Sequence, residues 1–173
     1  KGSPTDVAET TSDCITDFAN YAFNQAHAFC YAIVAYQTAW FKCHYPREYM
    51  AALLTSVLDS QGKIAEYIAE CRSLGIRLLP PDINQSGPDF TVAGRDIRFG
   101  LAALKGVGRG FTNAVLARRQ ADGPFTSFPD FCQRLLAQDL NTRVLQSLNR
   151  AGAFDATGVR RSQLLDHYAH LND

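Results

Sequence analysis

The sequence predicts a mainly helical fold with one small β-hairpin and, after it, two pairs of short helices. Three observations lead to this fold class. Apolar residues recur at helical spacing over most of the 173 residues. Residues 90–99 interrupt this pattern with two alternating segments around a Gly-containing turn, which indicates a β-hairpin. Beyond this hairpin the helical segments are short and are separated by turns.

The first two helices differ in their apolar patterns. Ser3 and Pro4 are typical of a helix start, and the helix that follows keeps one apolar face as far as Ala22. Residues 23–27 break the rhythm, and residues 28–44 then form a helix that is apolar on almost every side. A helix of this kind is normally surrounded by others, so we expect a buried core helix rather than a membrane span, for which it is short.

Two more helices precede the predicted β-hairpin. Pro46 ends the apolar helix and begins the next one, which is predicted at residues 47–58. A further helix is predicted at residues 64–74, where Gly75 is in the position that commonly closes a helix.

Residues 76–84, which contain Pro80 and Pro81, must be extended. The break near residues 80–88 is the best domain boundary. We therefore expect one domain over residues 1–86 and a second over residues 87–173. The first carries six Lys/Arg against nine Asp/Glu, and the second carries eleven against eight. Ten of those eleven cations are Arg, which suits phosphate recognition, so an anionic partner is expected at the second half.

The most informative stretch follows the predicted β-hairpin. Residues 101–109 read Leu-Ala-Ala-Leu-Lys-Gly-Val-Gly-Arg, a short helix and a turn that lead into a second helix ending near Arg119. Glycines on both sides of Val107 let the backbone turn tightly and expose its N–H groups. These groups lie at a helix N-terminus, where the helix dipole favours an anion, and Lys105 and Arg109 add positive charge. A nucleic-acid phosphate is the expected anion, and the pattern is that of a helix-hairpin-helix.

Most Gly-x-Gly turns between helices only connect the helices and bind no ligand, and this alternative applies to the present turn too. Apolar residues at helical spacing favour a turn packed between two helices over a free loop; they are Leu104, Val107, Phe111, Val115 and Leu116. The turn is not a Walker loop, because no Gly-Lys-Ser/Thr follows. It is not a dinucleotide fingerprint either, because no buried strand with an acidic partner follows.

A second, weaker helix-hairpin-helix is predicted after the first. Helices at 128–136 and 142–150 flank a turn that ends at the capping residue Asn141. This turn lacks glycines, so its N–H groups are less free, and we expect a structural partner of the first unit with Arg143 as a phosphate contact. A last amphipathic helix is predicted at residues 159–171.

Cysteine and histidine patterns disfavour several classes of site. The five cysteines are scattered and form no Cys-x-x-Cys pair, which is typical of reduced thiols that mostly pack in the core of a cytosolic protein: Cys14, Cys30, Cys43, Cys71 and Cys132. Neither Cys43-His44 nor His167 with His170 has a second ligand pair at suitable spacing, so no zinc site is expected. No nucleophile–base constellation appears, which disfavours an independent small enzyme.

Blocks of sequence along nearly the whole chain carry a family resemblance. They are residues 23–28, 31–32, 35–42, 44–46, 50–54, 79–84, 98–101, 104–108 and 151–155. In this order and spacing they resemble the alpha subunit of bacterial DNA polymerase III, the C-family of replicative DNA polymerases. Each block alone is modestly specific, but their order and spacing together are very specific.

The resemblance implies what each part of the chain does. Residues 1–86 would be the C-terminal part of the polymerase fingers, and residues 87–173 the helix-hairpin-helix region that grips duplex DNA behind the active site. The family's palm aspartates, which hold two Mg²⁺ ions for in-line attack on the nucleotide, precede this segment. We therefore expect no catalytic residue, metal site or cofactor here, and no DNA-directed DNA polymerase activity from this chain alone.

The resemblance and the turn together imply non-specific contacts to backbone phosphates, which weaken steeply with salt. The expected partners are duplex DNA, the remainder of the polymerase alpha subunit and, through regions outside this chain, other replisome subunits. The expected location is the bacterial cytoplasm, with no membrane partner. The residues expected to contact DNA are Lys105, Gly106, Val107, Gly108, Arg109 and Arg143.

One departure from the family pattern stands out. Where the family usually has Asn-Lys-Ser-His, this chain has Asn24-Gln25-Ala26-His27. In the family this segment lies near the incoming nucleotide and template, and only Asn24 and His27 carry over by position. Alternatively, Asn24 caps the long helix and His27 satisfies its first turn. Either the parent enzyme binds nucleotide through other cations, or the chain is a divergent paralogue with weakened polymerase function. An alternative function for the whole chain is a free-standing divergent paralogue that acts as a replisome protein-interaction module without DNA synthesis.

Overall fold

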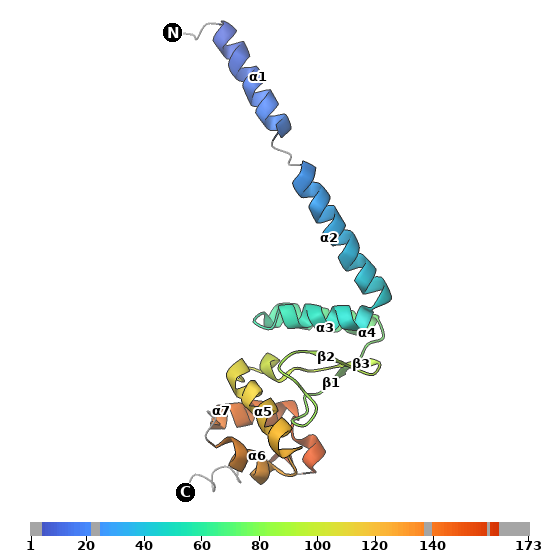
Figure 1. Cartoon of the computed structure of the whole chain (residues 1–173), viewed down its shortest axis with the longest axis vertical. Helices are drawn as coiled ribbons and strands as arrows, with labels where there is room; N and C mark the ends of the chain where they lie inside the picture. Colours follow the sequence, from blue (N-terminus) through green and yellow to red (C-terminus); the bar gives the residue numbers. More distant parts are fainter. Residues whose placement is uncertain (1–4, 22–24, 137–139, 159, 163–173) are drawn as a thin grey trace. The chain divides into compact units, whose positions relative to one another are not determined.

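The computed structural model of the chain describes residues 5–21, 25–136, 140–158 and 160–162 (Figure 1). The chain divides into two compact units, Lys1–His44 and Tyr45–Asp173. Helices make up most of the described residues, and the predicted mainly helical fold with one small β-hairpin is confirmed.

The first unit consists of helices α1 (Thr5–Tyr21) and α2 (Gln25–His44). The predicted helix start at Ser3 and Pro4 lies outside the described residues. Helix α2 begins three residues before the predicted start, and none of its residues is buried. The expected buried core helix is therefore wrong as a statement about this chain, since a helix that is apolar all round is buried only where other segments cover it. No helix in the described ranges is long and apolar enough to cross a membrane.

The second unit begins with helices α3 (Pro46–Ser56) and α4 (Gln61–Ser73), and α3 packs on α4 and on a small sheet. Gly75 ends α4 with a φ of +73°, as predicted from its position. Strands β2 (Thr91–Ala93) and β3 (Asp96–Arg98) form the predicted antiparallel hairpin. Strand β1 (Leu78–Leu79) pairs parallel to β3, which gives the order β1-β3-β2. The core of this part includes Met50, Leu54, Ile64, Cys71, Phe90 and Ile97.

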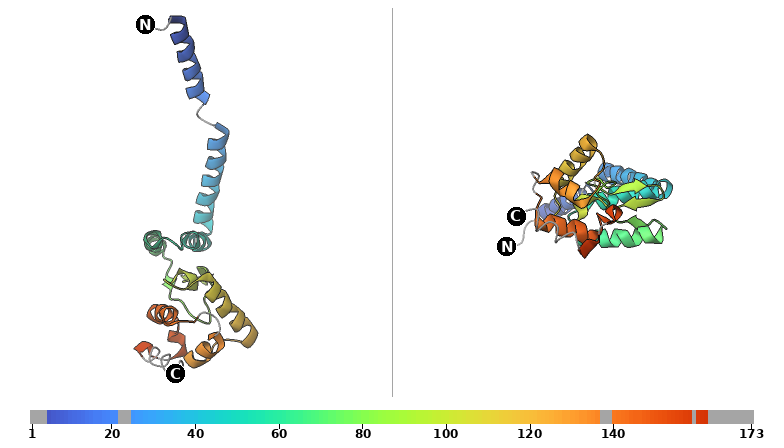
Figure 2. Two further views of the ribbon diagram at one scale, coloured as in Figure 1. Left: turned by 90° about the vertical axis from the view of Figure 1, so that its left-hand side faces the viewer. Right: turned by 90° about the horizontal axis from the view of Figure 1, so that it is seen from below.

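The remaining elements form a group of short helices, the yellow-to-red part of the ribbon in Figure 2. They are the 3₁₀ turn η1 (Leu101–Ala103), α5 (Arg109–Asp122), α6 (Phe128–Leu135), α7 (Thr142–Ala151) and η2 (Asp155–Thr157). Four phenylalanines meet edge to face in their core: Phe125, Phe128, Phe131 and Phe154. The first helix of the predicted hairpin is thus a single 3₁₀ turn, whereas α5, α6 and α7 follow the prediction closely.

Helix α7 begins at the residue that the sequence predicts and ends one residue beyond the predicted end. The side-chain oxygen of Asn141 accepts from the N–H of Val144 at 3.0 Å, and Gly152 adopts a φ of +84° at the C-cap. The turn residues 137–139 lie outside the described residues, as does most of the helix predicted at 159–171.

The expected boundary at residue 86 does not coincide with the division into compact units. Ile83 packs in the helical core of α5 to α7, whereas Phe90, Ile97 and Ala103 pack in the core of α3 and α4. Both cores therefore draw on residues from each side of position 86. Where the fingers end in the polymerase remains a prediction.

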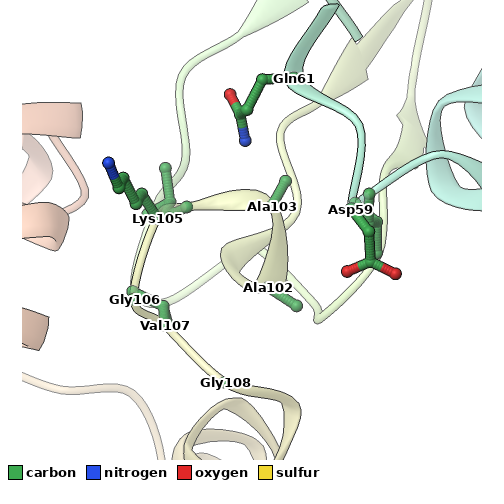
Figure 3. A pocket seen from close by; sticks show the side chains of 10 residues that line it. Asp59, Gln61, Ala102, Ala103, Lys105, Gly106, Val107 and Gly108 are labelled. Atoms are coloured by element: carbon green, nitrogen blue, oxygen red, sulfur yellow. The ribbon is translucent and has the colours of Figure 1, made fainter. Parts of the chain in front are cut away.

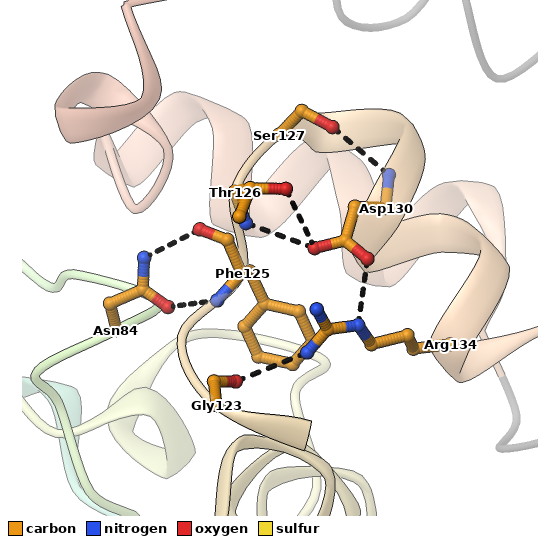
Figure 4. Close-up of polar contacts among 7 residues, drawn as sticks. All are labelled: Asn84, Gly123, Phe125, Thr126, Ser127, Asp130 and Arg134. Carbon is orange, nitrogen blue, oxygen red and sulfur yellow. Dashed lines mark hydrogen bonds and ion pairs between the residues drawn. The ribbon is translucent and has the colours of Figure 1, made fainter.

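A polar network fixes the connection between α5 and α6 (Figure 4). The side-chain amide of Asn84 donates to the Phe125 carbonyl at 2.9 Å and accepts from the Phe125 N–H at 2.8 Å. Arg134 donates to Asp130 at 2.7 Å and to the Gly123 carbonyl at 3.1 Å. Desolvation raises the pKa of Asp130, but hydrogen bonds from Thr126 and Arg134 together hold it below its usual value. These bonds tie the connection between α5 and α6 to Asn84 and to the side chains of α6.

Candidate nucleic-acid interface

The hairpin turn between η1 and α5 is anchored by its middle residue. Val107 is only 4% exposed and belongs to the helical core, together with Phe111 and Val115 from α5. Its N–H donates to the Leu104 carbonyl at 3.0 Å, so this amide is already used inside the turn. Gly106 adopts a φ of +83°, which L side chains rarely tolerate. The turn is therefore packed between elements, as its apolar spacing predicts.

Helix α5 begins immediately after the turn without a capping side chain. Gly108 is the N-cap in an extended conformation, and its carbonyl accepts from the N–H of Thr112 at 3.1 Å. The first N–H groups of a helix have no partner within the helix, and a glycine cap offers them no side-chain acceptor. Gly108, Arg109 and Gly110 are all exposed. The start of α5 therefore presents backbone donors and a positive dipole end to the surface.

The three glycines of this turn are required to different degrees. A Cβ at Gly106 would lie 3.2 Å from Nε of Arg143, in addition to the strain of its positive φ. A Cβ at Gly108 or Gly110 would meet nothing within 4 Å, and neither residue has a positive φ. The fold itself therefore does not demand glycine at positions 108 and 110. Gly110 was not among the predicted site residues, although the alternation Gly106-Gly108-Gly110 is visible in the sequence.

Helix α7 lies directly against the turn, which brings a distant predicted residue to the site. The Arg143 side chain passes over Gly106, since a Cβ there would lie 3.6 Å from both its Cγ and its Cδ. Ser147, one helical turn further along α7, donates its hydroxyl to the Lys105 carbonyl at 2.6 Å. The structure thus joins Arg143 to the predicted turn residues. No sequence signal indicated Ser147, because its partner is a backbone atom 42 residues away.

The cations at the turn have different surroundings. Lys105 and Arg143 are exposed. Arg109 is paired with Asp89 at 2.6 Å, and the two side chains are 57% and 39% exposed. Several other arginines of the second half bind partners within the fold: Arg98, Arg119, Arg134 and Arg161. The high arginine content of this half therefore serves internal contacts as well as the surface.

The comparisons with known proteins identify this hairpin. Residues 75–164, more than half of the chain, match the family described as "Helix-hairpin-helix motif". The chain belongs to the helix-hairpin-helix family. The matched span contains the turn, α5, α6 and α7, and it begins before the boundary expected from the sequence.

Three relatives of this chain share a name. The chain is 49% identical over 160 residues to DNA polymerase III subunit alpha of Thermus aquaticus, 45% over 166 residues to that of Deinococcus radiodurans, and 48% over 152 residues to that of Mycobacterium tuberculosis. These alignments cover 92%, 96% and 88% of this chain but 13%, 12% and 13% of the relatives. The resemblance to the alpha subunit of DNA polymerase III is confirmed, and the chain spans about an eighth of the length of these relatives.

A hollow of about 440 Å³ lies beside the turn of this helix-hairpin-helix (Figure 3). Its walls come from η1 and the turn, residues 102–108, and from the connection between α3 and α4, with Leu58, Asp59 and Gln61. Figure 3 shows Asp59 and Lys105 on opposite sides of Ala103. The hollow is bordered by the carboxylate of Asp59 and by the cation of Lys105, and Asp59 also borders a second hollow with Gly108 and Arg109.

The remaining predicted site residues belong to the first unit. Asn24 lies outside the described residues. His27 is exposed on α2, where its ring lies 4.6 Å from that of Tyr31. Their expected place near nucleotide and template remains a prediction.

The described cysteines and possible metal ligands test two further expectations from the sequence. Cys71 and Cys132 are buried, whereas Cys14, Cys30 and Cys43 are exposed, so the expectation of mostly core-packing thiols is wrong for three of the five. Burial raises the pKa of Cys132 to about 12. Among the described residues no group of three or more His, Cys, Asp or Glu could hold a metal ion. The two Mg²⁺ ions expected in the polymerase palm remain a prediction about residues outside this chain.

Proposed function

We propose that this chain is a segment of a replicative DNA polymerase that binds duplex DNA non-specifically through backbone phosphates. The observation that carries the proposal is the start of α5, where exposed backbone donors follow a glycine cap and Lys105, Arg109 and Arg143 border the turn. The helix-hairpin-helix match and the names of the relatives support the same function.

The glycines at positions 108 and 110 support a ligand that approaches the backbone closely. Gly110 is the second residue of α5, where glycine costs about 0.5–1 kcal/mol relative to alanine. Neither the backbone conformation nor the surrounding space requires glycine at position 110, so nothing within the fold compensates for this loss of stability. A phosphate bound to the first N–H groups of α5 would explain it, because a helical Cβ tilts toward the helix N-terminus and would crowd that phosphate.

Contacts of this kind read no sequence. Backbone N–H groups and exposed cations bind phosphate oxygens, which position a protein on the duplex without distinguishing bases. We infer that the chain holds duplex in register while residues elsewhere in the polymerase, with their metal ions, perform nucleotide addition. We also propose that the chain's partners are the remainder of the alpha subunit and other replisome subunits. The proposed location is the bacterial cytoplasm.

A second candidate, the free-standing protein-interaction module, is favoured by the first unit alone. Helix α2 exposes large apolar side chains that could bind another protein: Phe29, Tyr31, Ile33, Val34, Tyr36, Trp40 and Phe41. This candidate predicts no duplex binding, whereas the polymerase segment predicts binding that falls with salt.

Anisotropy of a short fluorescent duplex, measured against salt concentration, tests the proposal. Three cations border the turn, and the logarithmic salt slope is roughly −0.9 per phosphate neutralised, so we expect a slope of about −2 to −3. Unrelated duplex sequences should bind equally. Absence of binding at low salt, or a slope near zero, would contradict the proposal.

The variant Gly110→Ala separates binding from folding, and Gly62→Ala is its matched control. Gly62 is the second residue of α4, and a Cβ there also meets nothing within 4 Å. Both variants should stabilise the fold by about 0.5–1 kcal/mol. Only Gly110→Ala should weaken duplex binding, by about tenfold for one lost hydrogen bond to a charged group. Equal duplex affinities for the two variants would argue against close approach at α5.

A further inference from the structure

One acidic side chain stands at the proposed phosphate site and is not explained by phosphate binding. Asp89 lies in the segment before β2, and its carboxylate accepts from Nη2 of Arg109 at 2.6 Å. Arg109 is the first residue of α5, so the partner of this carboxylate is the cation nearest to the exposed N–H groups. Both side chains are partly exposed, at 39% for Asp89 and 57% for Arg109.

The position of Asp89 is fixed by the backbone that leads into the hairpin. A Cβ at Gly100 would lie 2.5 Å from both the Pro88 carbonyl oxygen and the Asp89 carbonyl carbon, so only glycine allows this approach. The N–H of Ala102, in η1, donates to the Pro88 carbonyl at 3.0 Å. The peptide before Asp89 is therefore held against η1, which also leads into the phosphate-binding turn. This close packing keeps the carboxylate beside the start of α5.

We propose that Asp89 weakens the hold of the hairpin on DNA by neutralising Arg109, an inference that rests on the function proposed above. A phosphate that approaches α5 must compete with this carboxylate for the guanidinium. An exposed ion pair is weak, so the competition reduces affinity by a few fold without abolishing it.

A weakened electrostatic hold suits a protein that must let duplex pass. Phosphate contacts that are screened and non-specific allow proteins to slide along DNA. Each additional phosphate contact strengthens binding to the same extent at every position along the duplex. With Arg109 held by Asp89, the cations nearest the turn that remain for phosphate are Lys105 and Arg143. Asp89 therefore sets how strongly the hairpin binds, and the glycines set where it binds.

The test is a double-mutant cycle measured by duplex anisotropy over a salt series, on the full chain. Asp89→Asn keeps the shape of the side chain and removes its charge. We expect about two- to fivefold tighter binding at low salt and a salt slope steeper by about one. In the Arg109→Ala background the same substitution should leave affinity unchanged, because the proposed effect acts only through that guanidinium.

Asp59→Asn is the matched control, since Asp59 is another exposed acid near the turn that borders a hollow with Arg109, whereas the described ion pair of Arg109 is with Asp89. Its effect should be the same with and without Arg109. Unchanged or weaker binding by Asp89→Asn would overturn the inference, as would tighter binding that persists in Arg109→Ala. If neither the unaltered chain nor Asp89→Asn binds duplex, the proposed function fails and this inference fails with it.

Discussion

The two units of this chain use apolar residues in opposite ways. In the second unit large side chains are fully buried in two cores, Leu54 in one and Phe131 in the other. In the first unit helix α2 has no buried residue, and even its large side chains Phe29 and Tyr36 are 66% and 71% exposed. Burial of apolar surface is the main favourable contribution to folding. The difference teaches that the second unit has buried cores of its own, whereas α2 of the first unit contributes no buried residue.

Separating the units is expected to have the largest effect. Residues 45–173 should unfold cooperatively on heating and bind duplex with the affinity of the full chain, because both cores and the hairpin lie there. Residues 1–44 should be weakly helical or should associate, since isolated helices are marginal in water and α2 is apolar. Circular dichroism and light scattering of the two fragments measure this. A stable, monomeric 1–44 fragment, or an unfolded 45–173 fragment, would contradict the comparison.

Truncating one phenylalanine in each unit sharpens the same contrast. Phe131→Ala removes a fully buried ring from the helical core and should cost about 3–5 kcal/mol of unfolding free energy. Phe29→Ala removes an exposed ring and should change the free energy by less than about 0.5 kcal/mol. Urea denaturation followed by circular dichroism gives both values, and similar losses for the two variants would break the comparison.

Acid should destabilise the second unit through a carboxylate at its sheet. A hydrogen bond from Arg77 is the main cause that lowers the pKa of Asp96 below its usual value. Because the pKa is lower in the folded state, the stabilisation is present above the unfolded value of about 4 and is lost as pH falls through the folded value. Asp96→Asn should therefore be less stable near neutral pH and show a smaller loss in acid. Parallel stability curves for the two proteins, from denaturation at a series of pH values, would show that this pair contributes nothing.

The reactivity of the native cysteines measures the difference in burial between the two units without any substitution. Cys14, Cys30 and Cys43 in the first unit are exposed and should react with a thiol reagent in the native protein. Cys71 and Cys132 in the second unit are buried, and burial raises the pKa of both thiols, so they should react only after unfolding. Mass spectrometry of the labelled protein distinguishes the sites. Labelling of Cys132 under native conditions would show that the helical core opens.

Much of the local structure could be predicted because its causes are local. Pro46, Gly75 and Asn141 mark helix ends through their own backbone preferences, and the Gly106-Val107-Gly108 turn identified the hairpin. The extended backbone at β1 was predicted, but its pairing with β3 was missed, since two residues carry no alternating pattern and their partner strand lies 19 positions along the chain.

The parts of the site that sequence reasoning missed depend on packing between distant elements. The Ser147 hydroxyl binds a backbone carbonyl of the turn, and Asp89 reaches Arg109 only because its segment packs against Gly100. The exposure of α2 could not be read from its apolar pattern either, because that pattern predicts that a helix is covered somewhere and does not say by what.

The central claim is that the hairpin of the second unit binds the duplex backbone through the start of α5. An NMR titration of the isotopically labelled chain with short duplex tests it most directly. The largest shifts of backbone amides should occur at Gly108, Arg109, Gly110 and Phe111, with smaller ones near Arg143 and none along α2. Duplex binding that leaves the amides of residues 108–111 unshifted would contradict the claim.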